Sequence, residues 1–270
     1  MTTDALRSYP IKGGEVGRAR LAVLARALAP TTERHLDRAG SLTGLTVVDV
    51  GCGGGDVTFA LARRVGPTGQ VIGIDLDEEK LGWARAEARA QSLAQARFES
   101  TNVTQPWPVT DVDLIYARFI LTHLREPEAM LARALAALKP GGRILVEDID
   151  FPGHFASPEC PAVDRFVALY MKLSRHRGGD PLIGRRLGLL LESAGYAGVE
   201  TALIQPFARQ GGAKDIAVLT FEAIAEGLIA EKLASADEVA EITRELKEFA
   251  ARLDTIISMP RIFQVWARKD

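Results

Sequence analysis

Cysteine and histidine are scarce in this sequence, which has two cysteines and four histidines among 270 residues. Cys52 and Cys160 are too few for a disulfide scaffold, and no Cys-x-x-Cys pair marks a structural zinc site. No group of His, Cys and carboxylate residues has the spacing of metal ligands, so we expect no metal ion. Thiols without a disulfide pattern are typical of a reducing compartment, and we expect a cytoplasmic protein.

The sequence also lacks an excess of either charge and a long apolar run. Lysine and arginine number 33 and aspartate and glutamate 35, which gives a formal net charge of −2. This balance provides no general attraction to phosphate backbones or anionic membranes, so we expect neither nucleic acid nor a membrane as a partner. No stretch approaches the ~18 apolar residues of a membrane span. The opening residues, MTTDALRSYP, have no basic segment followed by an apolar core, so we expect no secretory signal.

Strand and helix patterns alternate through the first half of the chain. β-branched and apolar runs predict strands at residues 45–50, 70–75, 96–100, 111–117 and 143–150. Helical periodicity fills the segments at residues 56–65, 77–91 and 127–142. This alternation favours an α/β fold with a doubly wound, mostly parallel sheet.

The flanking regions predict mainly helices. Residues 15–29 predict a helix that Pro30 ends, and Thr31 and Thr32 predict the cap of a second, short helix that ends at Gly40. Further helices are predicted at residues 162–174, 180–195, 213–230 and 235–253, and strands at 198–205 and 261–269. No linker or internal repeat divides the chain, so we expect one domain over residues 1–270.

The segment VVDVGCGGGDVTFA, residues 47–60, turns from a strand into a helix through Gly51, Gly53 and Gly55. Glycine allows positive φ angles and lets a ligand approach the backbone, and the helix N-terminus offers free N–H groups. Such a turn suits a nucleotide-like cofactor at the carboxyl end of the sheet. Glycine-rich turns also have purely structural roles, so the assignment needs support from other residues.

Acidic residues beside this turn supply that support. Asp75 ends the second strand, where a carboxylate can accept both hydroxyls of a ribose, and Asp77 already fills the alternative role of helix cap. Asp49 lies in an apolar strand, where a carboxylate is costly to bury, so we expect it to bond the loop or the ammonium of a ligand. A dinucleotide-binding dehydrogenase would need glycine at position 56, where this chain has Asp56, so NAD is excluded.

Taken together, these motifs resemble the class I S-adenosylmethionine-dependent methyltransferases, in particular the small-molecule group that includes quinone and natural-product enzymes. The motifs are DVGCGGG (49–55), VIGIDLD (71–77), FESTNV (98–103), DVDLIYARFILTHL (111–124), LKPGG (138–142) and ILVEDID (144–150). The resemblance implies a seven-stranded, Rossmann-like sheet whose last strand, at residues 261–269, runs antiparallel inside the edge. It also implies S-adenosylmethionine as the cofactor and S-adenosylhomocysteine as the product.

The same resemblance implies a function for each part of the chain and a set of cofactor-binding residues. Residues 1–40 would form a helical lid, 41–150 the cofactor-binding core and 151–270 the substrate-side helices and closing strands. Gly51, Cys52 and Gly53 would line the methionine part of the cofactor, with Ala117 and Arg118 at its end, Asp75 at the ribose, and Leu76, Asn102 and Val103 around the adenine. Asn102 stands where the family often has aspartate, and its amide oxygen would accept from the adenine amino group.

Two of these assignments have alternatives. Arg118 would pair with a carboxylate at the methionine end or form a surface salt bridge. Tyr9 would lie against the sulfonium through a cation–π contact or belong to a frayed terminus.

The resemblance implies in-line methyl transfer to an O, N or C atom of a small molecule. The sulfonium methyl is already activated, so the protein must chiefly position a nucleophile and exclude water. A hydroxyl or carbon acceptor needs a base, and His123, Asp148 and His154 are the candidates, each of which also suits a packing or capping role. A cofactor-binding module without transfer and a macromolecule methyltransferase remain alternatives. The protein would be a monomer or a homodimer.

Overall fold

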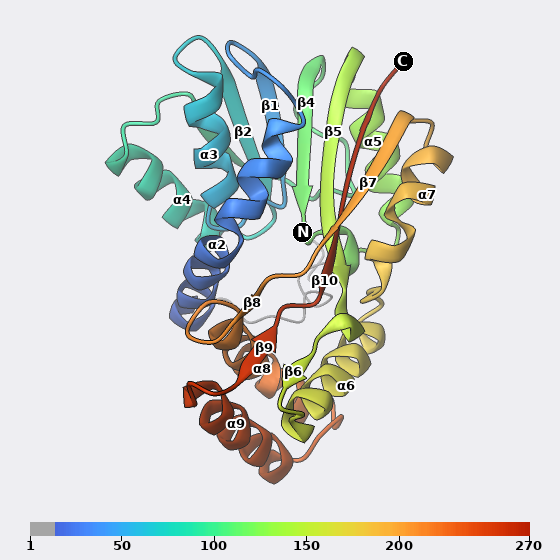
Figure 1. Ribbon diagram of the computed structural model, residues 1–270. Coiled ribbons are helices and arrows are strands. Elements are labelled where there is room, and N and C mark those ends of the chain that lie inside the picture. Colours follow the sequence, from blue (N-terminus) through green and yellow to red (C-terminus); the bar gives the residue numbers. More distant parts are fainter. Residues whose placement is uncertain (1–13) are drawn as a thin grey trace.

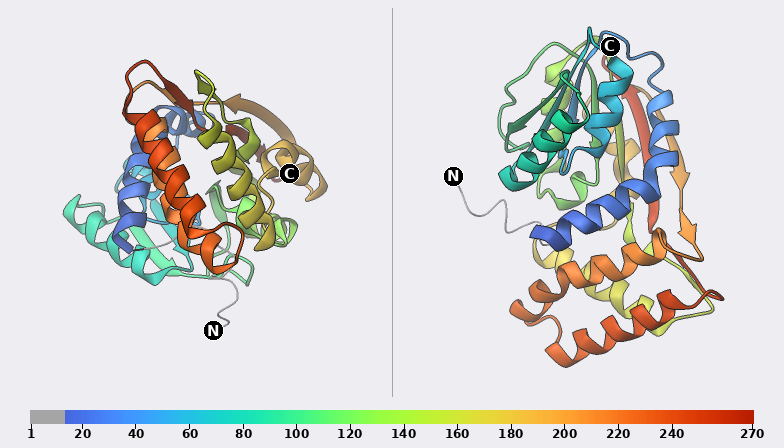
Figure 2. Two further views of the ribbon diagram at one scale, coloured as in Figure 1. Left: turned by 90° about the horizontal axis from the view of Figure 1, so that it is seen from below. Right: turned by 90° about the vertical axis from the view of Figure 1, so that its left-hand side faces the viewer.

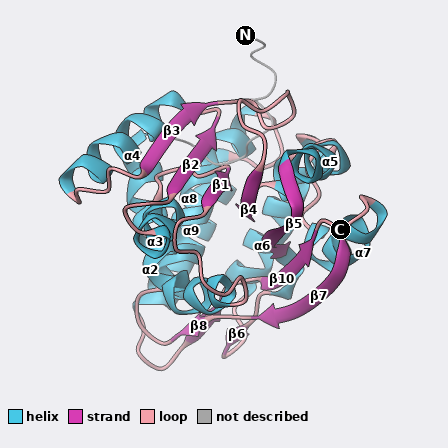
Figure 3. Cartoon of the chain, turned by 90° about the horizontal axis from the view of Figure 1, so that it is seen from above, coloured by secondary structure: helices cyan, strands magenta, loops and turns pink. Residues whose placement is uncertain are grey.

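The computed structural model describes residues 14–270, and its centre is a seven-stranded sheet with the order β3-β2-β1-β4-β5-β10-β7. Six strands run in one direction and β10 runs antiparallel to both of its neighbours. The strands are β1 Thr46–Val50, β2 Gln70–Asp75, β3 Ala96–Ser100, β4 Val112–Arg118, β5 Leu138–Asp150, β7 Ala197–Ile204 and β10 Arg261–Arg268. The prediction of a doubly wound, mostly parallel sheet with an antiparallel last strand is confirmed (Figure 3).

Helices cover both faces of this sheet, which explains why its inner strands are mostly apolar on both faces. One face packs against α3 and α4 and the end of α2, and the other against α5 and α7 (Figure 3). The helices are α2 Gly14–Asp37, α3 Asp56–Val65, α4 Glu78–Ala90, α5 Pro127–Ala137 and α7 Leu187–Ser193, with the 3-10 turns η1 Leu121–His123, η2 Phe151–Gly153 and η3 Ile183–Arg186. The carboxylate of Asp77 caps α4 as predicted, accepting from Glu79 N and Lys80 N.

A second layer, which we call the helical cap, lies beyond the carboxyl ends of the parallel strands (Figure 1). It comprises α6, α8, α9, a three-stranded sheet in the order β6-β9-β8, and residues 17–28 of α2. The bounds are α6 Pro161–His176, α8 Ala213–Ala230, α9 Ala236–Ala251, β6 Ala156–Ser157, β8 Phe207–Ala208 and β9 Ile256–Ser258. These strands have two or three residues each, too few to produce an alternating pattern, and the sequence did not predict them. Buried side chains of α2, α6, α8 and α9 form one apolar cluster.

The prediction that Pro30 ends the first helix is wrong, because α2 continues through Pro30 to Asp37. The Thr31 hydroxyl, predicted as an N-cap, instead donates to the carbonyl of Leu28 at 2.8 Å. Packing on both sides of the proline accounts for the continuation, since Leu28 is buried in the cap and Leu36 against the sheet. Figure 2 shows α2 running from the cap to the sheet layer, so one helix joins the two parts.

Within residues 14–270, no helix has both the length and the apolar character needed to cross a membrane.

Candidate active site

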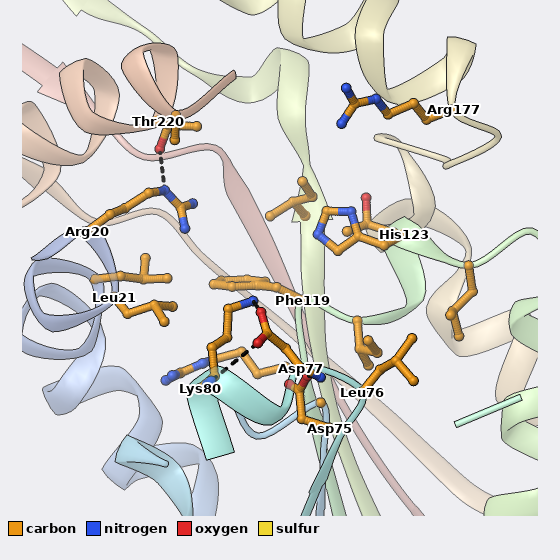
Figure 4. A pocket seen from close by; sticks show the side chains of 18 of the residues that line it. Arg20, Leu21, Asp75, Leu76, Asp77, Lys80, Phe119, His123, Arg177 and Thr220 are labelled. Atoms are coloured by element: carbon orange, nitrogen blue, oxygen red, sulfur yellow. Dashed lines mark hydrogen bonds and ion pairs between the residues drawn. The ribbon is translucent and has the colours of Figure 1, made fainter. Parts of the chain in front are cut away.

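A cavity of about 830 Å³ lies between the carboxyl edge of the sheet and the helical cap. Its lower wall is formed by the residues that follow β1, β2, β3 and β4, and its upper wall by side chains of α2, α6 and α8 (Figure 4). Ligands of open α/β sheets bind at this edge, where the strands end and the helices begin. The cavity is therefore the candidate site for both a cofactor and an acceptor.

The glycine turn after β1 forms the floor of this cavity. The backbone N–H groups of Gly51 and Cys52 both donate to the carbonyl of Ile74, at 2.8 and 3.1 Å, and so tie the turn to β2. Gly51 has a φ of +70°, and a Cβ there would lie 3.0 Å from the side chain of Ile120. The turn therefore requires glycine at position 51 for both its conformation and its packing.

Asp75, the predicted ribose ligand, lies at the end of β2 and borders the cavity. Its Oδ2 accepts from Gly53 N and its Oδ1 from Asp77 N, both at 2.9 Å. Two backbone donors thus fix the orientation of the carboxylate. Each oxygen retains a further acceptor position, so the group can still accept from two hydroxyls.

Asp49 and Cys52 also border the cavity, as predicted. Asp49 Oδ2 accepts from the Thr58 hydroxyl at 2.6 Å, so the expected bond goes to α3 and not to the glycine loop itself. Burial raises the pKa of Asp49 to about 7. Burial likewise raises the pKa of the Cys52 thiol well above its usual value, which leaves the thiol protonated and unreactive.

Arg118 is the last residue of β4 and forms an ion pair at 2.6 Å with Asp56, at the start of α3. Its Nη1 also donates to Thr32 at 3.2 Å. Arg118 thus forms a salt bridge within the protein, in which its own side chain is 11% exposed and that of Asp56 is 34% exposed. Burial alone would lower the pKa of this guanidinium, but Asp56, Tyr116 and Glu147 together outweigh it and raise the pKa.

Leu76, Asn102 and Val103, the predicted adenine contacts, all border the cavity. The amide oxygen of Asn102 already accepts from Thr104 N at 3.0 Å and from the Thr104 hydroxyl at 2.8 Å. Both of its acceptor positions are therefore used, and the expectation that this oxygen accepts from an adenine amino group is not supported.

Three predicted residues do not border the cavity. Ala117 is buried within β4 and packs in the core of the sheet. Gly53 acts through its backbone N–H, which holds Asp75. Asp148 is buried in β5, where its carboxylate accepts from Ile149 N and Thr122 N at 2.8 and 3.0 Å. Its hydrogen bond with Thr122 N links η1 to the sheet. Asp148 is therefore not placed to act as the general base for which it was a candidate. Tyr9 lies outside the described residues.

His123 and His154 both border the cavity. Burial, with Arg20 and Lys80 nearby, lowers the pKa of His123 to about 3. Burial lowers the pKa of His154 to about 4, and its Nδ1 bonds the carbonyl of Phe151 at 2.7 Å. Both rings are neutral at pH 7, and such low pKa values make them weak general bases.

The sequence did not predict the cap residues that border the cavity. They include Arg20 and Thr220 (Figure 4), together with Phe166 and Tyr170 of α6; Phe151 of η2, beside them, was not predicted either. One signal was available for Arg20, which precedes Leu24 by four residues and Leu28 by eight and so occupies a position on the buried face of α2. A charge on that face is unusual enough to indicate a site.

The described part of the chain holds no group of three or more His, Cys, Asp or Glu side chains arranged to bind a metal ion. Metal independence stays a prediction.

Comparisons with known proteins identify the family to which the sequence belongs. A family model described as a methyltransferase domain matches residues 41–177. Demethylmenaquinone methyltransferase of Lactococcus lactis is 33% identical over 44% of this chain and 48% of its own length. Nocamycin O-methyltransferase of Saccharothrix syringae is 34% identical over 43% of this chain and 41% of its own. The chain thus spans less than half the length of these relatives.

The fold has a counterpart among solved structures. An S-adenosylmethionine-dependent methyltransferase from Aquifex aeolicus superposes with a TM-score of 0.52 at 19% identity, covering 88% of this chain and 89% of its own. The likeness therefore extends beyond the matched segment to the cap and the closing strands.

Proposed function

Because the chain belongs to the methyltransferase domain family, we propose that it transfers the methyl group of S-adenosylmethionine to a small-molecule acceptor. The observation that carries this proposal is the carboxylate of Asp75. It borders the cavity beside the glycine turn and is oriented by two backbone N–H groups. A carboxylate so placed suits the two ribose hydroxyls of a nucleoside cofactor.

The residues around Asp75 fit the rest of that cofactor. The backbone at Gly51 and Cys52 provides a surface without bulky side chains for the methionine part. Asp49 faces the same region and would accept from the methionine ammonium, while Leu76 and Val103 provide an apolar surface for the adenine. When bound, the cofactor supplies an electrophilic methyl group.

Catalysis in this site would rest on position and not on a strong base. The two cavity histidines are weak bases, and Asp148 is engaged with backbone N–H groups outside the cavity. The protein would hold the acceptor atom in line with the methyl group and keep water out between the sheet edge and the cap. We propose that the acceptor nucleophile is an O, N or C atom that needs little further activation.

An acceptor of limited size suits a cavity of about 830 Å³ that the cap covers. The near-neutral charge of the chain gives no reason to expect a nucleic acid acceptor. We further propose that the protein is cytoplasmic, since Cys52 and Cys160 are both buried free thiols. We also propose that it is a monomer or a homodimer.

The proposal is tested by incubating the full chain with methyl-labelled S-adenosylmethionine and a cell extract divided into dialysable and macromolecular fractions. We expect label to enter a product of the dialysable fraction. Label that enters only the macromolecular fraction would support macromolecule methylation instead. Tight binding of S-adenosylhomocysteine with no transfer to either fraction would support a binding module without catalysis.

A further inference from the structure

Arg20 is a cation held against the cavity wall by two helices. The residue lies in α2, is only 8% exposed and borders the cavity. Its Nε donates to the hydroxyl of Thr220 in α8 at 3.1 Å, which uses one side of the guanidinium (Figure 4). The Nη1 and Nη2 groups remain as a pair of donors in fixed geometry.

Arg20 is a buried cation that forms no ion pair with a described side chain, whereas Arg125, which also borders the cavity without an ion pair, is exposed. Three other cations that border the cavity each pair with a carboxylate: Lys80 with Asp77, Arg118 with Asp56 and Arg177 with Glu231. Among residues 17–270, no carboxylate lies at ion-pair distance from Arg20. An arginine buried without an anion is costly, which indicates that a bound anion completes the site.

The carboxylates that border the cavity do not fill this role. Asp49 and Asp75 lie at the sheet edge, where Thr58 and the backbone N–H groups hold them. On the cap side, Glu126 and Glu226 are exposed and form no ion pair with Arg20. Among residues 17–270, therefore, no side chain supplies this anion, and a ligand would supply it.

The wall that Arg20 shares with the cap includes an apolar, aromatic stretch. Phe151 and Tyr170 stack with ring centroids 3.6 Å apart and an interplanar angle of 8°. Phe166 meets the ring of Phe151 edge-on at 5.5 Å. These three side chains and Leu24 belong to one apolar cluster and border the same cavity. A flat apolar body fits such a wall better than a polar one.

We propose that the acceptor is an apolar, ring-bearing molecule with a carboxylate, and that Arg20 binds this carboxylate through Nη1 and Nη2. The geometry suits a carboxylate because its two oxygens match the two parallel N–H donors of a guanidinium. Thr220 positions the guanidinium of Arg20 by accepting a hydrogen bond from its Nε. This inference rests on the proposed function, since it names the class of acceptor that the same site takes.

The test uses 2-naphthoate and its neutral analogue 2-naphthamide as probes, titrated by calorimetry into the full chain saturated with S-adenosylhomocysteine. We expect the wild type to bind naphthoate about tenfold or more tightly than naphthamide. Arg20→Gln should abolish this preference and Arg20→Lys should retain part of it. The matched control is Arg26→Gln, an exposed arginine of the same helix, which should keep the full preference.

Two further measurements distinguish the ways in which the inference fails. A wild type without preference for naphthoate overturns it. If Arg20→Gln weakens S-adenosylhomocysteine about tenfold and leaves naphthoate binding unchanged, Arg20 binds the carboxylate of the cofactor and the inference is again wrong.

Separate arms address the proposed function and the folding of the variant. The naphthoate and naphthamide titrations are repeated on the chain without S-adenosylhomocysteine, so that failure of the wild type to bind S-adenosylhomocysteine would contradict the proposed function alone. If Arg20→Gln does not fold, Thr220→Val tests the same subsite, with an expected partial loss of the preference. A full preference in Thr220→Val would then count against the positioning of Arg20.

Discussion

The sheet edge and the helical cap face each other across one cavity, but they place their functional side chains by different means. At the sheet edge, Asp75 is fixed by two backbone N–H groups. One belongs to Gly53 in the turn after β1, and the other to Asp77, two residues after Asp75 itself. In the cap, Arg20 is fixed by a hydroxyl from a helix 200 residues away in sequence. Local backbone geometry thus builds the edge, and packing of distant helices builds the cap.

This difference suggests that the sheet edge binds the cofactor and the cap binds the acceptor. A cofactor common to a whole family needs a surface that the backbone determines, and the sheet edge provides one. An acceptor that varies between enzymes needs a surface that side-chain substitutions can reshape without disturbing the sheet, and the cap provides that. The following predictions test this division through cofactor affinity, in order of decreasing effect.

Asp75→Ala should have the largest effect on cofactor affinity. Loss of hydrogen bonds from a charged acceptor to the ribose costs about 1.5–3 kcal/mol for each bond, which corresponds to tenfold or more. Calorimetry with S-adenosylhomocysteine measures this, with Glu79→Ala, an exposed acid of α4, as the matched control. Unchanged affinity in Asp75→Ala, with a normal melting curve, would remove Asp75 from the site.

Asp49 should make cofactor affinity depend on pH. Because its pKa is about 7 without ligand, the carboxylate is protonated at acidic pH and cannot pair with the methionine ammonium. The affinity for S-adenosylhomocysteine should therefore fall about tenfold as the pH is lowered from 8 to 6. Calorimetry across this range measures the slope.

Asp49→Asn is the control for this pH dependence. The variant should bind more weakly at pH 8 and show a flat profile. A slope that persists in Asp49→Asn would assign the titration to another group, for which buried Asp148, with its pKa also raised to about 7, is the next candidate.

Lys214→Met should weaken the cap and leave cofactor affinity within about twofold of the wild type. The buried ammonium of Lys214 donates to the carbonyls of Arg209, Arg252 and Thr255 and to the Thr255 hydroxyl. Each acceptor left without a donor costs about 1–3 kcal/mol. Urea unfolding should show the lost stability.

The control for the cap variant is Lys247→Met, in which an exposed lysine of α9 is replaced. It should unfold like the wild type. A tenfold loss of cofactor affinity in Lys214→Met would contradict the division between the two walls, because the cap would then support the cofactor as well.

A chelator should leave the binding of S-adenosylhomocysteine unchanged, which is the smallest of the expected effects. No group of potential metal ligands is arranged for a metal ion among residues 14–270, and a sulfonium needs no Lewis acid. The rise in melting temperature that S-adenosylhomocysteine produces should be the same with and without EDTA. A shift that EDTA removes and magnesium restores would refute this prediction.

The same difference between the walls determines what the sequence could predict. The strands, the glycine turn and Asp75 were found because their signals are local: apolar runs, positive-φ glycines and an acid at a strand end. Arg20 and Thr220 were not, because an amphipathic helix has the same periodicity whether its buried face meets another helix or a cavity.

Asp148 and Pro30 show where local signals mislead. An acid after an apolar strand indicates a catalytic group, but backbone N–H groups of Thr122 and Ile149 occupy the carboxylate of Asp148. A proline within a helical pattern usually ends the helix, yet packing on both sides of Pro30 carries α2 through it. In both cases tertiary contacts, which one sequence does not display, decided the outcome.

The position of β10 has a consequence for how the chain is synthesised. This strand is made after every other strand of the sheet, yet it lies between β5 and β7. Until residues 261–268 leave the ribosome, β5 presents an unpaired edge and β7 has no neighbour in the sheet. An exposed edge of this kind is a template for aggregation. Nascent chains that stall before residue 261 should therefore depend on chaperones, although their cofactor wall is already complete.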